Sequence, residues 1–177
     1  NPFFILSELE EARRNLPEKF FRQEYLAEFL LDVGEVFQGV DKVAKLDFSD
    51  VYSGEFVGAV DLARKDDYTV ITVMDVDNRR MVDLDRINNM DWKSQREFIH
   101  KMYNKWNLAT IFIEGNNAGS PIIEQLEDEG LPVEEFWTTN KSKQEIIDLL
   151  AVDIQNENIA LINDVNLVNE LQAYSMN

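Results

Sequence analysis

Two carboxylates stand at the points where apolar stretches of the chain end. Asp61 follows "FVGAV" inside one predicted strand, and Glu114 follows "ATIFI" at the end of another. Two acids that approach one another without a basic partner repel, and one becomes protonated unless a cation binds between them. Oxygen ligands with no His or Cys nearby select Mg²⁺ or Mn²⁺ over zinc. The pair therefore indicates a divalent-cation site, with helix-capping or solvated strand-end acids as the alternative.

A site of this kind has a specific chemical use. Two such ions about 3.5–4 Å apart form a common clamp for phosphodiester hydrolysis, in which one activates water and the other stabilises the leaving oxygen. The turn that follows the first strand adds Asp66 and Asp67. Aspartate is common in turns for local reasons, but we expect Asp67 to reach the cations and Asp66 to point to solvent.

Four polar residues are weaker candidates for shaping loops or contacting DNA, namely Asn116, Asn117, Lys141 and Lys143. The two asparagines follow the fourth strand, where they either shape the loop or orient waters or a phosphate. The two lysines lie at the start of a helix, where lysines are commonly solvated but where a DNA phosphate could also bind. The only histidine, His100, is predicted to lie on the exposed side of a helix and is no candidate for a catalytic base.

The composition limits the function classes. With 45% hydrophobic and 11% aromatic residues, the 177-residue chain can bury a core, and its apolar runs are too short to span a membrane. The net charge of −17 argues against tight nucleic-acid binding by this chain alone, because Lys and Arg bind phosphate backbones. There is no cysteine and no phosphate-loop, GxSxG, HExxH or GxGxxG motif, so thiolate metal sites and ATPase activity are excluded for this chain.

Hydrophobic patterning predicts the elements that position the two acids. Three strands, in "EFVGAVDLA", "TVITVMDVD" and "RRMVDLDRI", are expected to form an antiparallel meander. Asp91 can cap a helix over residues 92–106. The apolar stretch "ATIFIEG" is then a fourth strand, typical of one covered on both faces. This strand most economically lies beside the first and parallel to it, which brings Asp61 and Glu114 to the same rim of the sheet.

Two further helices and a strand complete the predicted order before a last helix. Ser120 and the proline after it open a helix that Gly130 closes, and "PVEEFWTT" is a fifth strand. Ser142 begins a capping box and with it the next helix, and a final helix runs from Asp164. The order β-β-β-α-β-α-β-α predicts an α/β fold with a mixed sheet, in which two parallel strands extend the antiparallel three-strand meander and helices flank it.

The first 50 residues differ from the rest of the chain. Residues 1–31 are predicted to be helical, with Pro17 in a first turn and Phe20, Phe21, Tyr25, Phe29 and Leu30 at helical spacing. Gly34 and Gly39 interrupt this pattern, and "EVFQGVDKVAKL" is predicted to be a short extended connector. Either an ordinary packed helical layer or a linker from a preceding domain explains the segment.

Four stretches, taken together and in order, resemble the nuclease domain of the large terminase subunit of tailed bacteriophages, which has a ribonuclease H-like fold. They are "FFRQEYLAEFLLDVGEVF", "FVGAVDLARKDDYTVITVMD", "IFIEGNNAGSPIIEQL" and "NKSKQEII". By this resemblance, Asp61 and Glu114 match the family's catalytic acids, which bind the metals, and Asp67 matches an auxiliary acid near them. The family completes its site with an aspartate near the C-terminus, whereas this chain has no Asp after Asp164.

The resemblance also implies a domain organisation. Residues 1–50 are expected to be a helical segment and connector from an absent N-terminal ATPase domain. Residues 51–177 are expected to be a ribonuclease H-like nuclease domain that is truncated at its C-terminus. Without the third acid, residues 1–177 should cut DNA weakly or not at all.

The implied activity is that of a divalent-metal-dependent endonuclease that uses Mg²⁺ or Mn²⁺, as two ions, to cut concatemeric viral DNA during genome packaging. The implied partners are double-stranded DNA, the portal and the small terminase subunit, with no membrane, and the implied location is the host cell cytoplasm. Two alternatives stay open. One is another ribonuclease H-like nuclease, such as a junction resolvase or a transposase, and the other is a non-catalytic docking domain of the packaging motor.

Overall fold

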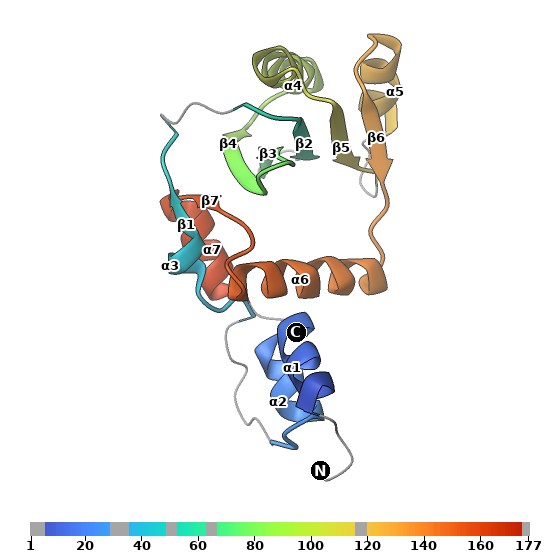
Figure 1. The fold of residues 1–177 in the computed structure, drawn as a ribbon. Helices are drawn as coiled ribbons and strands as arrows, with labels where there is room; N and C mark the ends of the chain where they lie inside the picture. The colour runs from blue at the N-terminus through green and yellow to red at the C-terminus, as the bar shows by residue number, and fades with distance from the viewer. Residues whose placement is uncertain (1–5, 29–35, 49–52, 63–66, 116–119, 175–177) are drawn as a thin grey trace. The chain divides into compact units, whose positions relative to one another are not determined.

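The structure is a computed structural model that describes residues 6–28, 36–48, 53–62, 67–115 and 120–174 (Figure 1). The chain divides into two compact units. Residues 46–139 form the first, which we call the sheet unit, and residues 1–45 together with 140–177 form the second, which we call the helical unit. The predicted division at residue 50 is a statement about domains of a longer protein and stays a prediction.

The sheet unit is built on five strands in the order β4-β3-β2-β5-β6 (Figure 1). The strands are β2 (Phe56–Asp61), β3 (Tyr68–Asp75), β4 (Arg80–Asn88), β5 (Thr110–Glu114) and β6 (Val133–Phe136). Strands β2, β3 and β4 pair antiparallel, whereas β5 pairs parallel to β2 and β6 pairs parallel to β5. The predicted mixed sheet, a meander extended by two parallel strands, is confirmed.

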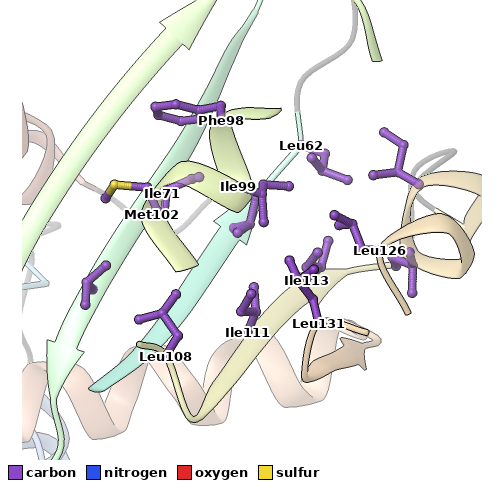
Figure 2. Close-up of a cluster of buried hydrophobic side chains, with 14 of the residues drawn as sticks. Leu62, Ile71, Phe98, Ile99, Met102, Leu108, Ile111, Ile113, Leu126 and Leu131 are labelled. Atoms are coloured by element: carbon purple, nitrogen blue, oxygen red, sulfur yellow. The ribbon is translucent and has the colours of Figure 1, made fainter. Parts of the chain in front are cut away.

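Two helices, α4 (Trp92–Trp106) and α5 (Ser120–Asp128), cover one face of this sheet. Helix α4 begins where predicted, because the Asp91 side chain accepts a hydrogen bond of 2.8 Å from the Ser94 amide. Alternate strand residues and one stripe of each helix form a single core, part of which is drawn in Figure 2. Ile111 and Ile113, both fully buried, hold β5 at the centre of this core.

The opposite face of β5 corrects one expectation. The continuous apolar run predicted a strand covered on both faces, but Phe112, which points away from the core, is 38% exposed. Its neighbour on β2, Ala59, is also exposed. The sheet is therefore well covered on the face of α4 and α5 and partly open on the other.

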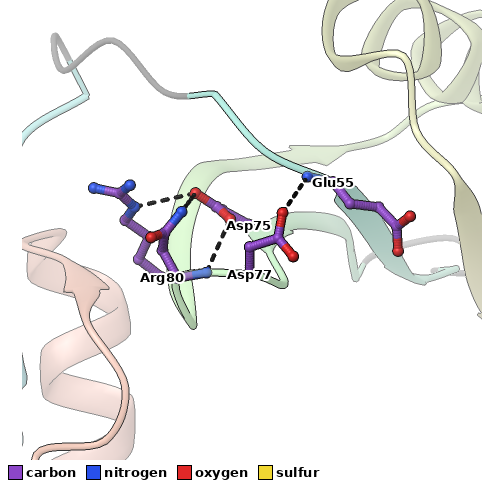
Figure 3. Close-up of polar contacts among 5 residues, drawn as sticks. Glu55, Asp75, Asp77 and Arg80 are labelled. Carbon is purple, nitrogen blue, oxygen red and sulfur yellow. Dashed lines mark hydrogen bonds and ion pairs between the residues drawn. The ribbon is translucent and has the colours of Figure 1, made fainter.

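A polar network closes the hairpin between β3 and β4 (Figure 3). Asp75 is fully buried and accepts hydrogen bonds from Asn78 Nδ2 at 2.8 Å and from Arg80 Nε at 3.1 Å. Desolvation raises the pKa of Asp75, but the hydrogen bonds from Asn78 and the Arg80 charge outweigh it and hold that pKa below its usual value. Asp77 accepts a bond of 3.2 Å from the Glu55 amide, so the turn also anchors the start of β2.

The helical unit combines the two ends of the chain. It contains α1 (Leu6–Asn15), α2 (Glu18–Glu24), α3 (Val40–Val43), α6 (Asn140–Gln155) and α7 (Val165–Ala173), together with a two-stranded sheet of β1 (Ala44–Leu46) and β7 (Leu161–Ile162). Helix α7 begins as predicted, because Asp164 accepts hydrogen bonds of 3.0 Å from the Asn166 and Leu167 amides. No helix among the residues described is long and apolar enough to cross a membrane.

Three predictions for this unit were wrong in detail. The connector expected to be extended contains α3 and β1, because Val40 and Val43 are buried and β1 pairs with the distant β7. Helix α6 begins at Asn140, ahead of the predicted capping position. Helix α2 ends at Glu24, and Ala27 adopts a left-handed conformation (φ 53°) that a continuing helix cannot contain. The predicted helical positions Phe29 and Leu30 lie outside the described residues.

Candidate active site

Asp61 and Glu114 come to the same level of the sheet because β2 and β5 are adjacent and parallel. The register pairs Val60 with Ile113, and both of these residues are buried. The next residue of each strand is the acid, so side-chain alternation turns both carboxylates to the face away from the core. The predicted placement on neighbouring parallel strands is confirmed, and the sharing of one cation between them stays a prediction.

The electrostatics of the pair match this geometry. Desolvation, then the charge of Glu114 and then that of Asp67, raise the pKa of Asp61 above its usual value. The Asp61 side chain is nevertheless exposed, so neighbouring protein shields the carboxylate without enclosing it. Within the part of the chain that the structure describes, no Lys, Arg or His forms an ion pair with any of these three acids. Among the described residues, the negative charge at this rim of the sheet is therefore not paired with a basic side chain.

Glu114 has a second neighbour on the other side, from the strand that follows it in the sheet. Glu114 pairs with Phe136 in the parallel register of β5 and β6. Two residues after Phe136, the Thr138 hydroxyl donates a hydrogen bond to Glu114 Oε1. One oxygen of the candidate ligand is thereby held by a neutral donor.

A hollow of about 230 Å³ lies on the partly open face of the sheet, against the two acids. Its lining includes Asp61, Glu114, Thr72, Phe112 and Phe136. The carboxylates therefore adjoin an accessible, largely apolar depression and not a closed cavity.

The remaining predicted site residues have different positions. Asp67 directly precedes β3 and is exposed, and its carboxylate accepts a hydrogen bond of 2.8 Å from the Tyr68 amide. Lys141 and Lys143 are exposed on α6 of the helical unit, where Lys141 lies 3.8 Å from Glu145. Their proposed contact with DNA stays a prediction. Asp66, Asn116 and Asn117 lie outside the described residues.

The donor set fits a hard divalent cation in kind. Asp61, Glu114 and Asp67 supply only carboxylate oxygens, which Mg²⁺ and Mn²⁺ prefer, and no basic side chain among the described residues forms an ion pair with them. Among the described residues, however, no three His, Cys, Asp or Glu side chains gather closely enough to hold a metal ion. A complete coordination shell at this rim would therefore need waters, substrate oxygens or further protein ligands.

Sequence reasoning missed Thr138 and the aromatic lining. The sequence pattern assigned Thr138 to the end of a fifth strand, but β6 ends at Phe136, and the hydroxyl two residues later reaches Glu114. Nothing in "FWTT" indicates which threonine faces the acid. Only the register between β5 and β6 could have identified it.

Curated relatives resemble the chain over most of its length. It is 26% identical over 175 residues to the large terminase subunits of Thermus virus P23-45 and Thermus phage G20c, with 93% of this chain covered. A shorter match, 33% identical over 81 residues, is to the large terminase subunit of Escherichia phage T5. The chain spans only 36% of the length of the two Thermus relatives.

Solved structures show the same fold. The large terminase nuclease of thermophilic phage G20c superposes with a TM-score of 0.72 at 20% identity, covering 80% of this chain and 82% of that one. The same nuclease with bound magnesium gives a TM-score of 0.71 at 21% identity, covering 81% and 82%. The large terminase nuclease domain of Thermus phage P74-26 gives 0.69 at 22% identity, covering 78% of this chain and 77% of that one.

A family model decides the assignment. The model described as the terminase RNaseH-like domain matches residues 58–173, which include both rim acids and every strand of the five-stranded sheet except the first two residues of β2. This agrees with the resemblance drawn from the four sequence stretches. The chain belongs to the terminase RNaseH-like domain family.

Proposed function

We propose that this chain is the metal-dependent DNA endonuclease module of a viral DNA-packaging motor, which cuts concatemeric DNA by two-metal phosphodiester hydrolysis. The observation that carries the proposal is that Asp61 and Glu114 lie at the same level on adjacent parallel strands. No basic side chain among the described residues is paired with their charge. The membership in the terminase family supplies the context, and the bound magnesium, zinc and cobalt described for the G20c nuclease support a divalent-metal site.

In this proposal Asp61 and Glu114 bind the cations directly, and Asp67 binds at the edge of the same site. When bound, Mg²⁺ or Mn²⁺ activates water for attack on the phosphodiester and stabilises the leaving oxygen. The charges of Glu114 and Asp67 disfavour the ionised form of Asp61, and a bound cation would relieve that repulsion. The hollow beside Asp61 and Glu114 leaves that rim open to a polymer that is too large for a closed pocket.

The acidic composition bears on how DNA would be held. Lys and Arg favour DNA binding by neutralising phosphates and releasing the counterions of the DNA. A chain with 17 basic and 34 acidic residues can gain little binding free energy in this way. Other parts of the motor are therefore proposed to supply most of the affinity for double-stranded DNA, with Lys141 and Lys143 as local contacts. The portal and the small terminase subunit are the proposed partners, and the host cell cytoplasm is the proposed location.

The decisive experiment uses a complete large subunit that carries this chain. Asp61→Asn and Glu114→Gln should each reduce Mg²⁺- or Mn²⁺-dependent linearisation of supercoiled plasmid by at least about 100-fold, which corresponds to roughly 3 kcal/mol of lost transition-state stabilisation. Asp85→Asn is the matched control, since Asp85 is an exposed acid of β4 whose carboxylate accepts a hydrogen bond from the backbone amide of its neighbour, Arg86. An Asp61→Asn protein that still linearised plasmid at the wild-type rate would refute the proposal.

A second candidate function is a non-catalytic docking domain of the packaging motor. This candidate is favoured because, among the described residues, no third acid lies close enough to Asp61 and Glu114 to share a metal ion with them. Plasmid cleavage separates the two candidates, because a docking domain would leave plasmid intact in every metal. With the 177-residue chain alone we expect weak cleavage at most, and robust cleavage would show that no further acid is required.

A further inference from the structure

Thr138 forms a hydrogen bond with one of the two rim carboxylates. Its hydroxyl donates to Glu114 Oε1, and both side chains are half-buried at the exits of neighbouring parallel strands. Asp61, by contrast, faces the like charges of Glu114 and Asp67. The two candidate ligands are therefore held in different ways.

The backbone around Thr138 keeps this contact in place. The ladder between β5 and β6 continues past the end of β5, where the Gly115 amide donates to the Phe136 carbonyl at 3.0 Å. A Cβ built at Gly115 would meet the exposed side chain of Glu135 on β6, which shows how near the two strand exits lie to each other. Close pairing of the two strand exits sets the distance between Glu114 and the chain segment that carries Thr138.

The contact has a clear physical consequence for Glu114. Two like charges on adjacent strands push apart, and a glutamate has enough rotatable bonds to swing its carboxylate away from Asp61. A donor fixed just beyond β6 removes that freedom while leaving the second oxygen and the remaining lone pairs of Oε1 able to accept a ligand. Hydrogen bonds of this kind orient metal-binding side chains, and their loss typically lowers metal affinity about 10–100-fold.

We propose that Thr138 is a positioning residue that holds the Glu114 carboxylate in its cation-binding orientation. This inference rests on the proposed function, since it assumes that Glu114 binds a divalent cation. Thr138 itself touches neither the cation nor the substrate in this proposal. Its contribution is to reduce the reorganisation that Glu114 must undergo when the cation arrives.

The test measures Mn²⁺ affinity in the 177-residue chain, by calorimetry and by the electron paramagnetic resonance signal of free Mn²⁺. Thr138→Val removes the hydroxyl and keeps the shape, and it should weaken Mn²⁺ binding about 10–100-fold. Thr138→Ser keeps the hydroxyl and should bind within about threefold of wild type, since the donor to Glu114 remains. Thr110→Val, at the other end of β5, is the control for losing a threonine hydroxyl from this sheet and should bind like wild type.

The outcomes separate the inference from the proposed function. Binding by Thr138→Val that equals wild type, in a chain where Asp61→Asn abolishes binding, overturns the role of Thr138 and leaves the metal site standing. A Ser variant as weak as the Val variant also overturns it, since a hydroxyl would then not be the cause. If wild type binds no Mn²⁺, both the inference and the metal site of this chain fail. Thermal unfolding of each variant checks that a lost affinity does not come from a lost fold.

Discussion

Asp61 and Glu114 end two neighbouring parallel strands one residue beyond a buried register pair, Val60 and Ile113. That single step beyond the pair turns both acids out of the core and onto the same face. Because the strands run parallel, the acids also meet at the same rim of the sheet. The resulting charge has several measurable consequences.

The first prediction concerns the stability of Asp61→Asn as a function of pH. The folded-state pKa of Asp61 is raised, so the folded chain binds this proton more tightly than the unfolded chain does. The associated stabilisation is present below the ordinary value of 3.8 and is lost as the pH rises through the folded-state pKa. Asparagine avoids this loss, so the melting temperature of Asp61→Asn should match wild type near pH 3 and exceed it at pH 7.

Thermal unfolding across this pH range, without divalent metal, measures the effect. Asp85→Asn removes the same charge from the net −17 on β4, which is separated from β2 by β3, and it controls for the change in total charge. A melting-temperature difference for Asp61→Asn that is the same at pH 3 and pH 7 would contradict the assignment.

The second prediction is that divalent cations stabilise the chain through the same acids. A ligand that binds only the folded state adds about 2.7 kcal/mol at a concentration roughly 100 times its dissociation constant. Mn²⁺ should therefore raise the melting temperature of wild type at pH 7, and it should have little effect on Asp61→Asn or Glu114→Gln. An equal rise in all three proteins would point to binding elsewhere on this acidic surface.

The third prediction separates Asp67 from the aspartate that precedes it in the sequence, Asp66. Asp67 contributes to the raised pKa of Asp61, so its charge reaches the rim. Asp67→Ala should lower plasmid cleavage by a complete subunit about tenfold or more, the usual scale for residues that support a metal site. Asp66→Ala serves as the neighbouring control and should change cleavage little. Equal losses in the two variants would contradict the role given to Asp67.

The fourth prediction tests the hairpin network away from the site. Asp75→Asn keeps the size of the side chain but removes the charged carboxylate to which Arg80 and Asn78 donate hydrogen bonds. It should lower the free energy of unfolding by about 2 kcal/mol. Because the pKa of Asp75 is lowered in the folded state, this contribution is present above the ordinary value of 3.8 and is lost as the pH falls through the folded-state pKa. Urea unfolding at pH 7 gives the magnitude.

Asp77→Asn is the matched control for Asp75, since the side-chain oxygen of asparagine at that position can still accept a hydrogen bond from the Glu55 backbone amide. Its unfolding free energy should stay within about 0.5 kcal/mol of wild type, as for most surface substitutions. A larger loss for Asp77→Asn than for Asp75→Asn would show that the turn, and not the buried carboxylate, stabilises the hairpin.

The sequence alone determined the order and type of the elements in the sheet unit. Alternating apolar residues specified the three strands of the meander, and the capping aspartates Asp91 and Asp164 located two helix starts. These signals are local, because a strand pattern or a helix cap depends on only a few consecutive residues. The position of Glu114 at the end of its strand could be predicted for the same reason, whereas Asp61 was predicted inside its strand and the structure ends β2 there.

Other features depended on which distant segments pair, and only the tertiary structure decided them. The strand β1 exists because it pairs with β7, near the other end of the chain, and its own sequence predicted only a connector. Thr138 bonds Glu114 because β6 takes one particular register beside β5. A shift of that register by one residue would turn the side chains of β6 to opposite faces. Backbone pairing between separate segments, and not any local pattern, therefore placed the hydroxyl next to the acid.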